Sequence, residues 1–227
     1  MTLYPEKQIR YASRSLRFEL FEHFLNFPTT SGSVSGSLDL QVSLASGAVS
    51  LAGSDAAHPG VIRLSTGIVA TGRAGLQTGL NAVLLGSGVY EIEFSFKLSS
   101  SLSDATNTYS MWLGFSDSIT GIGANTAGLY YSSASNTNFL YVCRKASVET
   151  AIASSVVADL NWHIINIVVD KPGNNAVFTL DNTTPVTVST NVPNTNRIGL
   201  CSYILKSVGT TARTLDIDYE TLKADFT

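Results

Sequence analysis

Apolar and polar residues alternate along most of the chain, which is the pattern of β-strands buried on one face. The clearest case is Val89–Leu98, in which every even-numbered position is apolar and the odd-numbered positions from Glu91 to Lys97 are polar. Turn clusters rich in Ser, Asn, Gly and Pro separate such runs, and no convincing long helix interrupts them, so we predict an all-β sandwich or barrel. Further strands are predicted at Val61–Ser65, Tyr109–Phe115, Gly128–Ser132, Phe139–Arg144, Trp162–Asp170, Ala176–Leu180, Arg197–Lys206 and Thr214–Leu222.

The first part of the chain is less regular. Residues 1–15 are polar and mixed in charge, so we expect a short N-terminal arm in front of one β domain that spans 16–227. The apolar residues of Leu16–Phe27 fit either a helix or a strand, and its four Phe favour the strand. Residues 28–57 are rich in Ser and Gly, and they are expected to form weak strands and loops rather than a linker.

Charge limits the partners that can be expected. The chain has 227 residues, of which only 14% are charged, and its net charge is −3. A nucleic-acid-binding surface or an anionic-membrane-binding surface needs clustered cations, so neither partner is expected. The first residues lack the apolar stretch of a secretory signal, and the longest apolar runs are too short to span a bilayer. Cys143 and Cys201 lie in apolar runs and are expected to be buried thiols, with a single bridge as the alternative.

Catalytic patterns are present only in part. Glu91 and Glu93 share one face of a strand, as the paired carboxylates of a retaining glycosidase could, but the third carboxylate of the jelly-roll glucanase pattern is missing. The segment Gly114–Ser118 lacks the last glycine of a serine-hydrolase elbow. The three histidines are isolated and do not have the spacing of zinc ligands. We therefore expect no catalytic residue, no cofactor and no enzymatic activity.

Two acidic features could hold Ca²⁺, although a solvated surface is the simpler interpretation. Asp216, Asp218 and Glu220 form a stripe that is expected to face solvent, while Leu215, Ile217 and Tyr219 face the core. A flat strand cannot wrap around a cation. Asp117 lies in a turn that could join a Ca²⁺ site, but no second ligand matches it. The prediction is therefore that no metal is bound.

A glycan site is the binding function that the residues favour most. Sugars stack on aromatic rings and hydrogen-bond to amides and hydroxyls, and these groups gather in the middle of the chain. The alternative is that one tyrosine packs in the core and that the asparagines only build turns. The candidate carbohydrate-binding residues are Tyr130, Tyr131, Asn125, Asn136 and Asn138.

Several strings of residues carry a family resemblance. They are HPGVIRLSTGIVATGRAGL at 58–76, Asn161-Trp162-His163, VFTLDN at 177–182, Asn191-Val192-Pro193 and LKSVGTTARTLDIDYETL at 205–222. Together they resemble the concanavalin-like, or laminin-G-like, jelly-roll domains of bacteriophage virion proteins, which include tail-fibre, appendage and capsid-surface proteins. The resemblance covers about residues 16–226. It implies a concanavalin-like jelly-roll β-sandwich with a short N-terminal arm, and a place in a virion, but not a chemistry.

The resemblance leads to a ranked expectation of function. First comes a non-enzymatic structural protein of a phage virion, made in the host cytoplasm, that decorates the capsid as a cement protein. The alternative is a tail-fibre or receptor-binding component that recognises a host-surface glycan; a solitary carbohydrate-binding module and an enzyme rank third and fourth. The expected partners are other virion proteins, capsid or tail subunits, and further copies of the chain in a homo-oligomer, most simply a trimer. The candidate assembly contacts are Leu3, Tyr4, Ile9 and Tyr11 of the arm.

Overall fold

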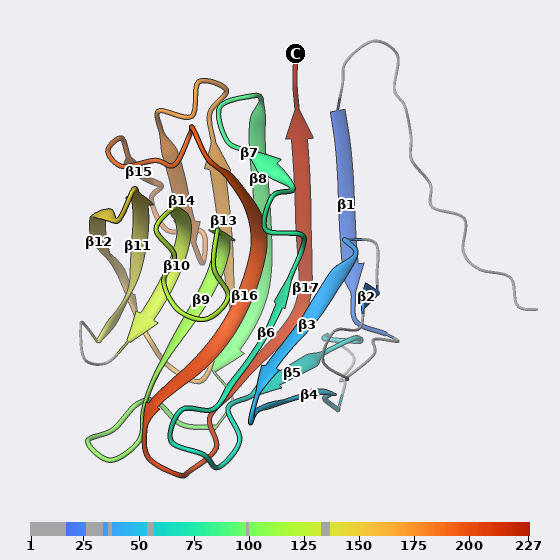
Figure 1. Cartoon of the computed structure of the whole chain (residues 1–227), viewed down its shortest axis with the longest axis vertical. Helices are drawn as coiled ribbons and strands as arrows, with labels where there is room; N and C mark the ends of the chain where they lie inside the picture. The colour runs from blue at the N-terminus through green and yellow to red at the C-terminus, as the bar shows by residue number, and fades with distance from the viewer. Residues whose placement is uncertain (1–16, 26–33, 36–37, 54–56, 99, 133–136) are drawn as a thin grey trace, which may run out of the picture.

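The computed structural model describes residues 17–25, 34–35, 38–53, 57–98, 100–132 and 137–227. Two antiparallel sheets pack face to face in a β-sandwich (Figure 1), so the predicted all-β, concanavalin-like fold is confirmed. The predicted arm 1–15, with its candidate contacts, lies outside the described residues. No helix in the described part of the chain is long and apolar enough to cross a membrane.

The first sheet has eight strands in the order β15-β14-β13-β8-β17-β5-β4, and β1 also pairs with β17. We call it sheet A. β17 is central, because β8 pairs along one edge while β5 and β1 pair with successive parts of the other. The bounds are β1 Arg17–His23, β4 Ala48–Leu51, β5 Ile62–Ser65, β8 Val89–Leu98, β13 His163–Val169, β14 Ala176–Leu180, β15 Val186–Val188 and β17 Thr214–Asp225.

The second sheet, sheet B, has nine strands in the order β12-β11-β10-β9-β16-β6-β3-β2, with β7 paired to β16. The long strand β16 curves across the front of the molecule in Figure 1, and β17 runs behind it in sheet A. The bounds are β2 Val34–Ser35, β3 Leu40–Ala45, β6 Arg73–Gln77, β7 Val83–Leu84, β9 Thr108–Ser116, β10 Thr126–Ser132, β11 Asn138–Lys145, β12 Val148–Val157 and β16 Arg197–Val208.

The core fills the space between the sheets. β8 has the predicted bounds, and its even-numbered side chains from Tyr90 to Leu98 are all buried. β1 is a strand, as the four Phe suggested, and its inward residues Phe18 and Leu20 pack on the core.

β12 was not predicted from the sequence. It is the outermost strand of sheet B and has only one fully buried residue, Ser154, so its apolar residues do not alternate clearly.

The prediction for β17 is wrong in its second half. A bulge between Ile217 and Tyr219 shifts the register against β8 by one residue. Leu215 and Ile217 lie opposite Leu98 and Phe96, as expected for core residues, but beyond the bulge Glu220 lies opposite Phe94. The face of a strand changes whenever its register moves by one residue, so Glu220 points into the core and Tyr219 points outward.

The acidic stripe is therefore not a solvated surface. Asp216, Asp218 and Glu220 are 2%, 4% and 0% exposed. Asp216 and Asp218 lie on the outer face of sheet A, where other side chains cover them, and Glu220 lies between the sheets. Each carboxyl group has a specific partner, because an unpaired charge is costly to bury.

Candidate functional site

Of the tyrosines and asparagines predicted to bind a glycan, Tyr131 and Asn125 are buried and not at the surface. Tyr131 is only 2% exposed, its ring packs on Tyr109, and its hydroxyl accepts a hydrogen bond from the amide of Ser103 at 3.1 Å. Its ring therefore has no free face on which a sugar could stack. Asn125 is also buried, and its side-chain amide donates to Asp117 Oδ2 at 2.8 Å. Both residues have structural roles.

The other two described members of that set, Tyr130 and Asn138, lie on the neighbouring strands β10 and β11. Tyr130 is half-buried on the outer face of sheet B, where it packs against Trp112. Asn138 donates to the carbonyl of Ser154 at 2.8 Å, which joins β11 to β12. Asn136 lies outside the described residues. In the described part of the chain, no group of three or more His, Cys, Asp or Glu is arranged to hold a metal ion.

Three of the strings that carry the family resemblance meet on the outer face of sheet A. His58 stacks on Trp162, with ring centroids 4.0 Å apart and an angle of 18° between the planes. His58 Nδ1 lies 3.0 Å from Asp218 Oδ2, and the ammonium of Lys97 lies 5.1 Å from the centre of the Trp162 ring. These contacts join the turn before β5 to β17, β8 and the start of β13. We call His58, Trp162, Lys97 and Asp218 the outer clasp.

Asp216 extends the outer clasp along β17. Arg63 on β5 donates two hydrogen bonds to this carboxylate, from Nε and from one terminal nitrogen, each 2.7 Å long. Such a two-bond pair fixes both side chains more firmly than a single contact does. The hydrogen bond to Asp216 raises the pKa of Arg63 from its ordinary value. Arg63 and Asp216 therefore form a fixed ion pair next to the outer clasp.

Beside the outer clasp, aromatic rings reach the surface. Phe21 on β1 is 43% exposed, and its ring stacks on Tyr219 with centroids 5.3 Å apart and an angle of 24°. His23 meets Phe21 edge-on at 4.5 Å. The Tyr219 hydroxyl donates to Glu93 Oε1 at 2.8 Å. Burial and this bond to a carboxylate both raise the pKa of Tyr219.

A row of polar groups continues across the same face. Glu91 Oε1 accepts hydrogen bonds from Asn166 Nδ2 at 3.0 Å and from Lys223 Nζ at 3.3 Å. Glu91 and Glu93 thus each have partners of their own within the sheet. We call Phe21, Tyr219, Glu93, Glu91 and Asn166 the aromatic–acidic strip. It offers an apolar ring face next to carboxylate and amide groups that can bond to hydroxyls.

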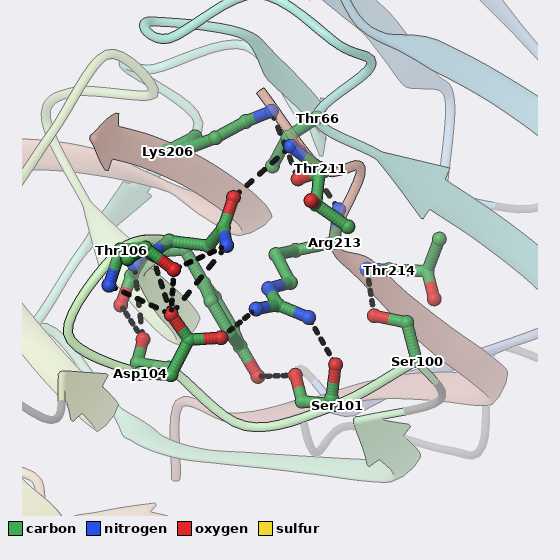
Figure 2. A network of polar contacts seen from close by, with 12 residues as sticks. Thr66, Ser100, Ser101, Asp104, Thr106, Lys206, Thr211, Arg213 and Thr214 are labelled. Carbon is green, nitrogen blue, oxygen red and sulfur yellow. Dashed lines mark hydrogen bonds and ion pairs between the residues drawn. The ribbon is translucent and has the colours of Figure 1, made fainter. Parts of the chain in front are cut away.

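A second cluster joins residues of two of the quoted strings, 58–76 and 205–222, and its contacts are structural (Figure 2). Lys206 is 1% exposed, and its ammonium donates to the carbonyls of Gly67 at 2.6 Å and Thr211 at 3.0 Å. Burial, and then the charge of Arg213, lower the pKa of Lys206. The backbone of Arg213 is bonded to Thr66 through its N–H and its carbonyl. These bonds tie the loop after β5 to the end of β16 and the start of β17.

The loop before β9 joins the same cluster. The guanidinium of Arg213 contacts Ser101 Oγ and forms an ion pair with Asp104, as Figure 2 shows. Hydrogen bonds from Thr106 and from the amide of Asn107 lower the pKa of Asp104. The string KSVGTTART and the segment STG thus close one end of the sandwich. Their two charged side chains, Lys206 and Arg213, are both buried, which fits a structural role.

Residues of the outer face of sheet A can be found in the sequence, but their contacts with one another cannot be predicted from it. His58 and Trp162 stand in the quoted strings, but nothing in the sequence shows that their rings stack on each other. Phe21 lay in the segment that fitted either a helix or a strand. Only the pairing of β1 with β17, and the bulge in β17, bring Phe21 to Tyr219.

Comparisons with known proteins agree with this fold. The family described as SO2946-like, C-terminal domain, matches residues 57–218, which include both clusters of motif residues. No curated protein matches the chain. A protein of unknown function, SO2946 from Shewanella oneidensis MR-1, is similar in structure with a TM-score of 0.69 and 20% identity, over 94% of this chain and 89% of that one.

Two further structures are similar in fold at low identity. The structure of a carbohydrate esterase from the Shiga toxin-encoding bacteriophage phi24B has a TM-score of 0.56 and 16% identity, over 87% of this chain and 99% of that one. Arcelin-5, a lectin-like defence protein from Phaseolus vulgaris, has a TM-score of 0.55 and 11% identity, over 92% and 99% of the two chains. At these identities the similarity establishes a lectin-like β-sandwich and no particular ligand.

Proposed function

The chain belongs to the SO2946-like, C-terminal domain family, and from its fold and its outer face we propose that it is a non-enzymatic recognition module of a phage particle that binds host-surface glycan. The observation that carries the proposal is the aromatic–acidic strip on sheet A. Phe21 presents a ring beside Glu93, Glu91 and Asn166, which are acceptors and donors for sugar hydroxyls. Two proteins of similar fold, a lectin-like plant protein and a carbohydrate esterase from a phage, support it at the level of the fold.

Carbohydrate recognition fits this surface better than catalysis does. A retaining glycosidase needs one carboxylate as nucleophile and a second as proton donor about 5–5.5 Å away. Here Glu93 accepts the Tyr219 hydroxyl, and Glu91 is held by Asn166 and Lys223. Groups held in this way suit a fixed pattern of hydrogen bonds to a ligand. We therefore propose a binding role without turnover.

Capsid decoration is the second candidate, and the position of β1 favours it. This strand leads directly from the N-terminal segment, lies at an edge where it pairs with β17, and carries the exposed Phe21. A protein partner that held the arm could cover the same face. In either role the proposed location is the virion. The proposed partners are other virion proteins and further copies of the chain, which would form a trimer. Nucleic acid and membrane are not proposed as partners.

Replacement of Phe21 tests the glycan role. We expect the intact protein to bind at least one polysaccharide on an array of bacterial surface glycans. Phe21→Ala should weaken that binding by about fivefold, because loss of a stacked ring costs on the order of 1 kcal/mol. Calorimetry with the polysaccharide identified on the array would measure the change.

The control is Val148→Ala, which removes an apolar side chain that is 60% exposed on sheet B. It should bind as the unchanged protein does. Absence of binding to every glycan on the array would reject the glycan role. Equal affinity of the Phe21 and Val148 variants would show that a glycan binds elsewhere.

A further inference from the structure

A loop at one end of the sandwich presents apolar side chains to solvent. It consists of residues 66–72, between β5 and β6, and it contains no charged residue. Ile68 is 73% exposed, the highest value among the large apolar side chains of the described residues, and Val69 is 46% exposed. Single exposed apolar residues are common, but a fixed pair of them can dock into a complementary hollow. We call Ile68 and Val69 the knob.

Lys206 holds this loop at both of its ends. Its ammonium donates to the Gly67 carbonyl at 2.6 Å, and its backbone amide donates to the Gly72 carbonyl at 2.9 Å. Within the loop, the Gly72 amide donates to the Val69 carbonyl at 3.1 Å. A Cβ atom at Gly72 would collide with the Thr66 carbonyl oxygen, so the two ends of the loop are in close contact. The knob is therefore fixed in place and would lose little conformational entropy on binding.

A cavity at the other end of the sandwich has matching chemistry. Its volume is about 340 Å³, and it lies between β1, β8 and β17 on one side and β7 and the residues just before β3 on the other. The hydroxyls in its wall already have partners, since Tyr90 bonds to Ser87 and Thr78 accepts from the amide of Leu200, each at 2.9 Å. An aliphatic side chain, which needs no hydrogen bond, therefore suits this cavity. The apolar wall consists of Phe18, Leu20, Leu38, Val83, Leu222 and Phe226.

The knob and the cavity lie too far apart to meet within one molecule. The loop follows Ser65, which pairs with Thr214 at the start of β17. The cavity lies at the other end of β17, where Arg17 pairs with Asp225 (Figure 1). The twelve residues of β17 separate the two ends by roughly 30 Å. The cavity is accessible to a second molecule because its wall includes the exposed residues Asp39, Gly79 and Ala82.

We propose that the knob of one copy enters the cavity of a second copy, so that copies of the chain associate head to tail. The same chain carries both surfaces, and the loop has no charge that would be left unpaired on burial. A contact between two different surfaces either closes into a ring or continues as a chain of copies. It specifies the contact in the homo-oligomer proposed above, and it does not depend on the glycan role.

Analytical ultracentrifugation of the full chain tests the contact at concentrations from about 1 µM to about 1 mM. The unchanged protein should form oligomers as its concentration rises. Ile68→Asp should weaken this association by at least about tenfold, because a charge is costly to bury in an apolar cavity. Ala82→Arg, which places a large charged side chain at the cavity, should weaken it as well. The control is Val148→Asp, at a site that is 60% exposed on sheet B, and it should associate as the unchanged protein does.

A mixture of the two variants distinguishes this contact from others. Ile68→Asp keeps its cavity and Ala82→Arg keeps its knob, so equal amounts should form dimers that grow no further. Both positions are exposed, so each variant should keep the thermal midpoint of the unchanged protein.

The proposal is overturned if the unchanged protein stays monomeric at about 1 mM, or if its oligomers persist in either variant. It is also overturned if the mixture forms no dimers, because the knob would then bind elsewhere. These measurements contain no glycan, so their outcome is independent of the proposed glycan role.

Discussion

At the scale of single residues, burial decides roles that residue type alone suggested wrongly. Tyr131 has the right ring for a sugar but is buried, and Asp216, which was expected on a solvated face, is buried and paired with Arg63. The exposed ring is Phe21, which no chemical motif had marked. A tyrosine in a strand can face either way, and only its register decides whether it is available.

Lys206 allows the structural cluster to be tested. Lys206→Met should lower the free energy of unfolding by about 1–3 kcal/mol, because the carbonyls of Gly67 and Thr211 would lose their buried donor. Denaturation in urea would measure the change. Lys171→Met is the control, since its ammonium donates to the Thr227 carbonyl at an exposed site, and its loss should cost less than about 0.5 kcal/mol. Equal effects would mean that the buried ammonium does not stabilise the cluster.

At the scale of strands, Gly128 shows how closely neighbouring elements fit. A Cβ atom at this position of β10 would lie 2.5 Å from the Leu113 carbonyl oxygen and 2.6 Å from the Trp112 ring. Gly128→Ala should therefore lower the free energy of unfolding by about 1–3 kcal/mol through overpacking. Thermal unfolding would reveal the loss as a lower midpoint.

Gly53→Ala is the matched control, because nothing lies within 4 Å of the added Cβ there. Its midpoint should equal that of the unchanged protein or rise slightly. A Gly128 variant that is as stable as the Gly53 variant would show that Trp112 can move aside without cost.

Most strands could be predicted from the sequence, and the reasons for the exceptions are physical. Val89–Leu98 alternates strictly because one face meets the core and the other does not. β12 lies at the edge of its sheet and has little buried surface to impose a pattern. The β17 bulge inserts one residue into an otherwise regular alternation, and no residue type in Leu215–Leu222 marks the position. For this reason the sequence located the strand but reversed the faces of Tyr219 and Glu220.

At the scale of the whole molecule, two proposed roles make different demands on the N-terminal segment. The aromatic–acidic strip consists of residues from β1, β17, β8 and β13, so the sandwich alone can provide it. Decoration of a capsid would instead depend on the arm, with Leu3, Tyr4, Ile9 and Tyr11 as its apolar anchors. Ordering an arm on a partner costs about 1–2 kcal/mol per residue, so such anchors would have to bury substantial apolar surface.

Deletion of residues 1–15 separates these roles. We expect the shortened protein to keep its thermal midpoint, because the described strands begin at Arg17. Glycan affinity should stay within about twofold of the full chain, a difference below 0.5 kcal/mol. Calorimetry and sedimentation with isolated capsids would measure both kinds of binding. If the shortened protein stays folded but loses the glycan, the arm belongs to the recognition surface and the assignment to sheet A is wrong. If the full chain sediments with capsids and the shortened one does not, decoration becomes the primary role, and Phe21 then belongs to a contact between proteins.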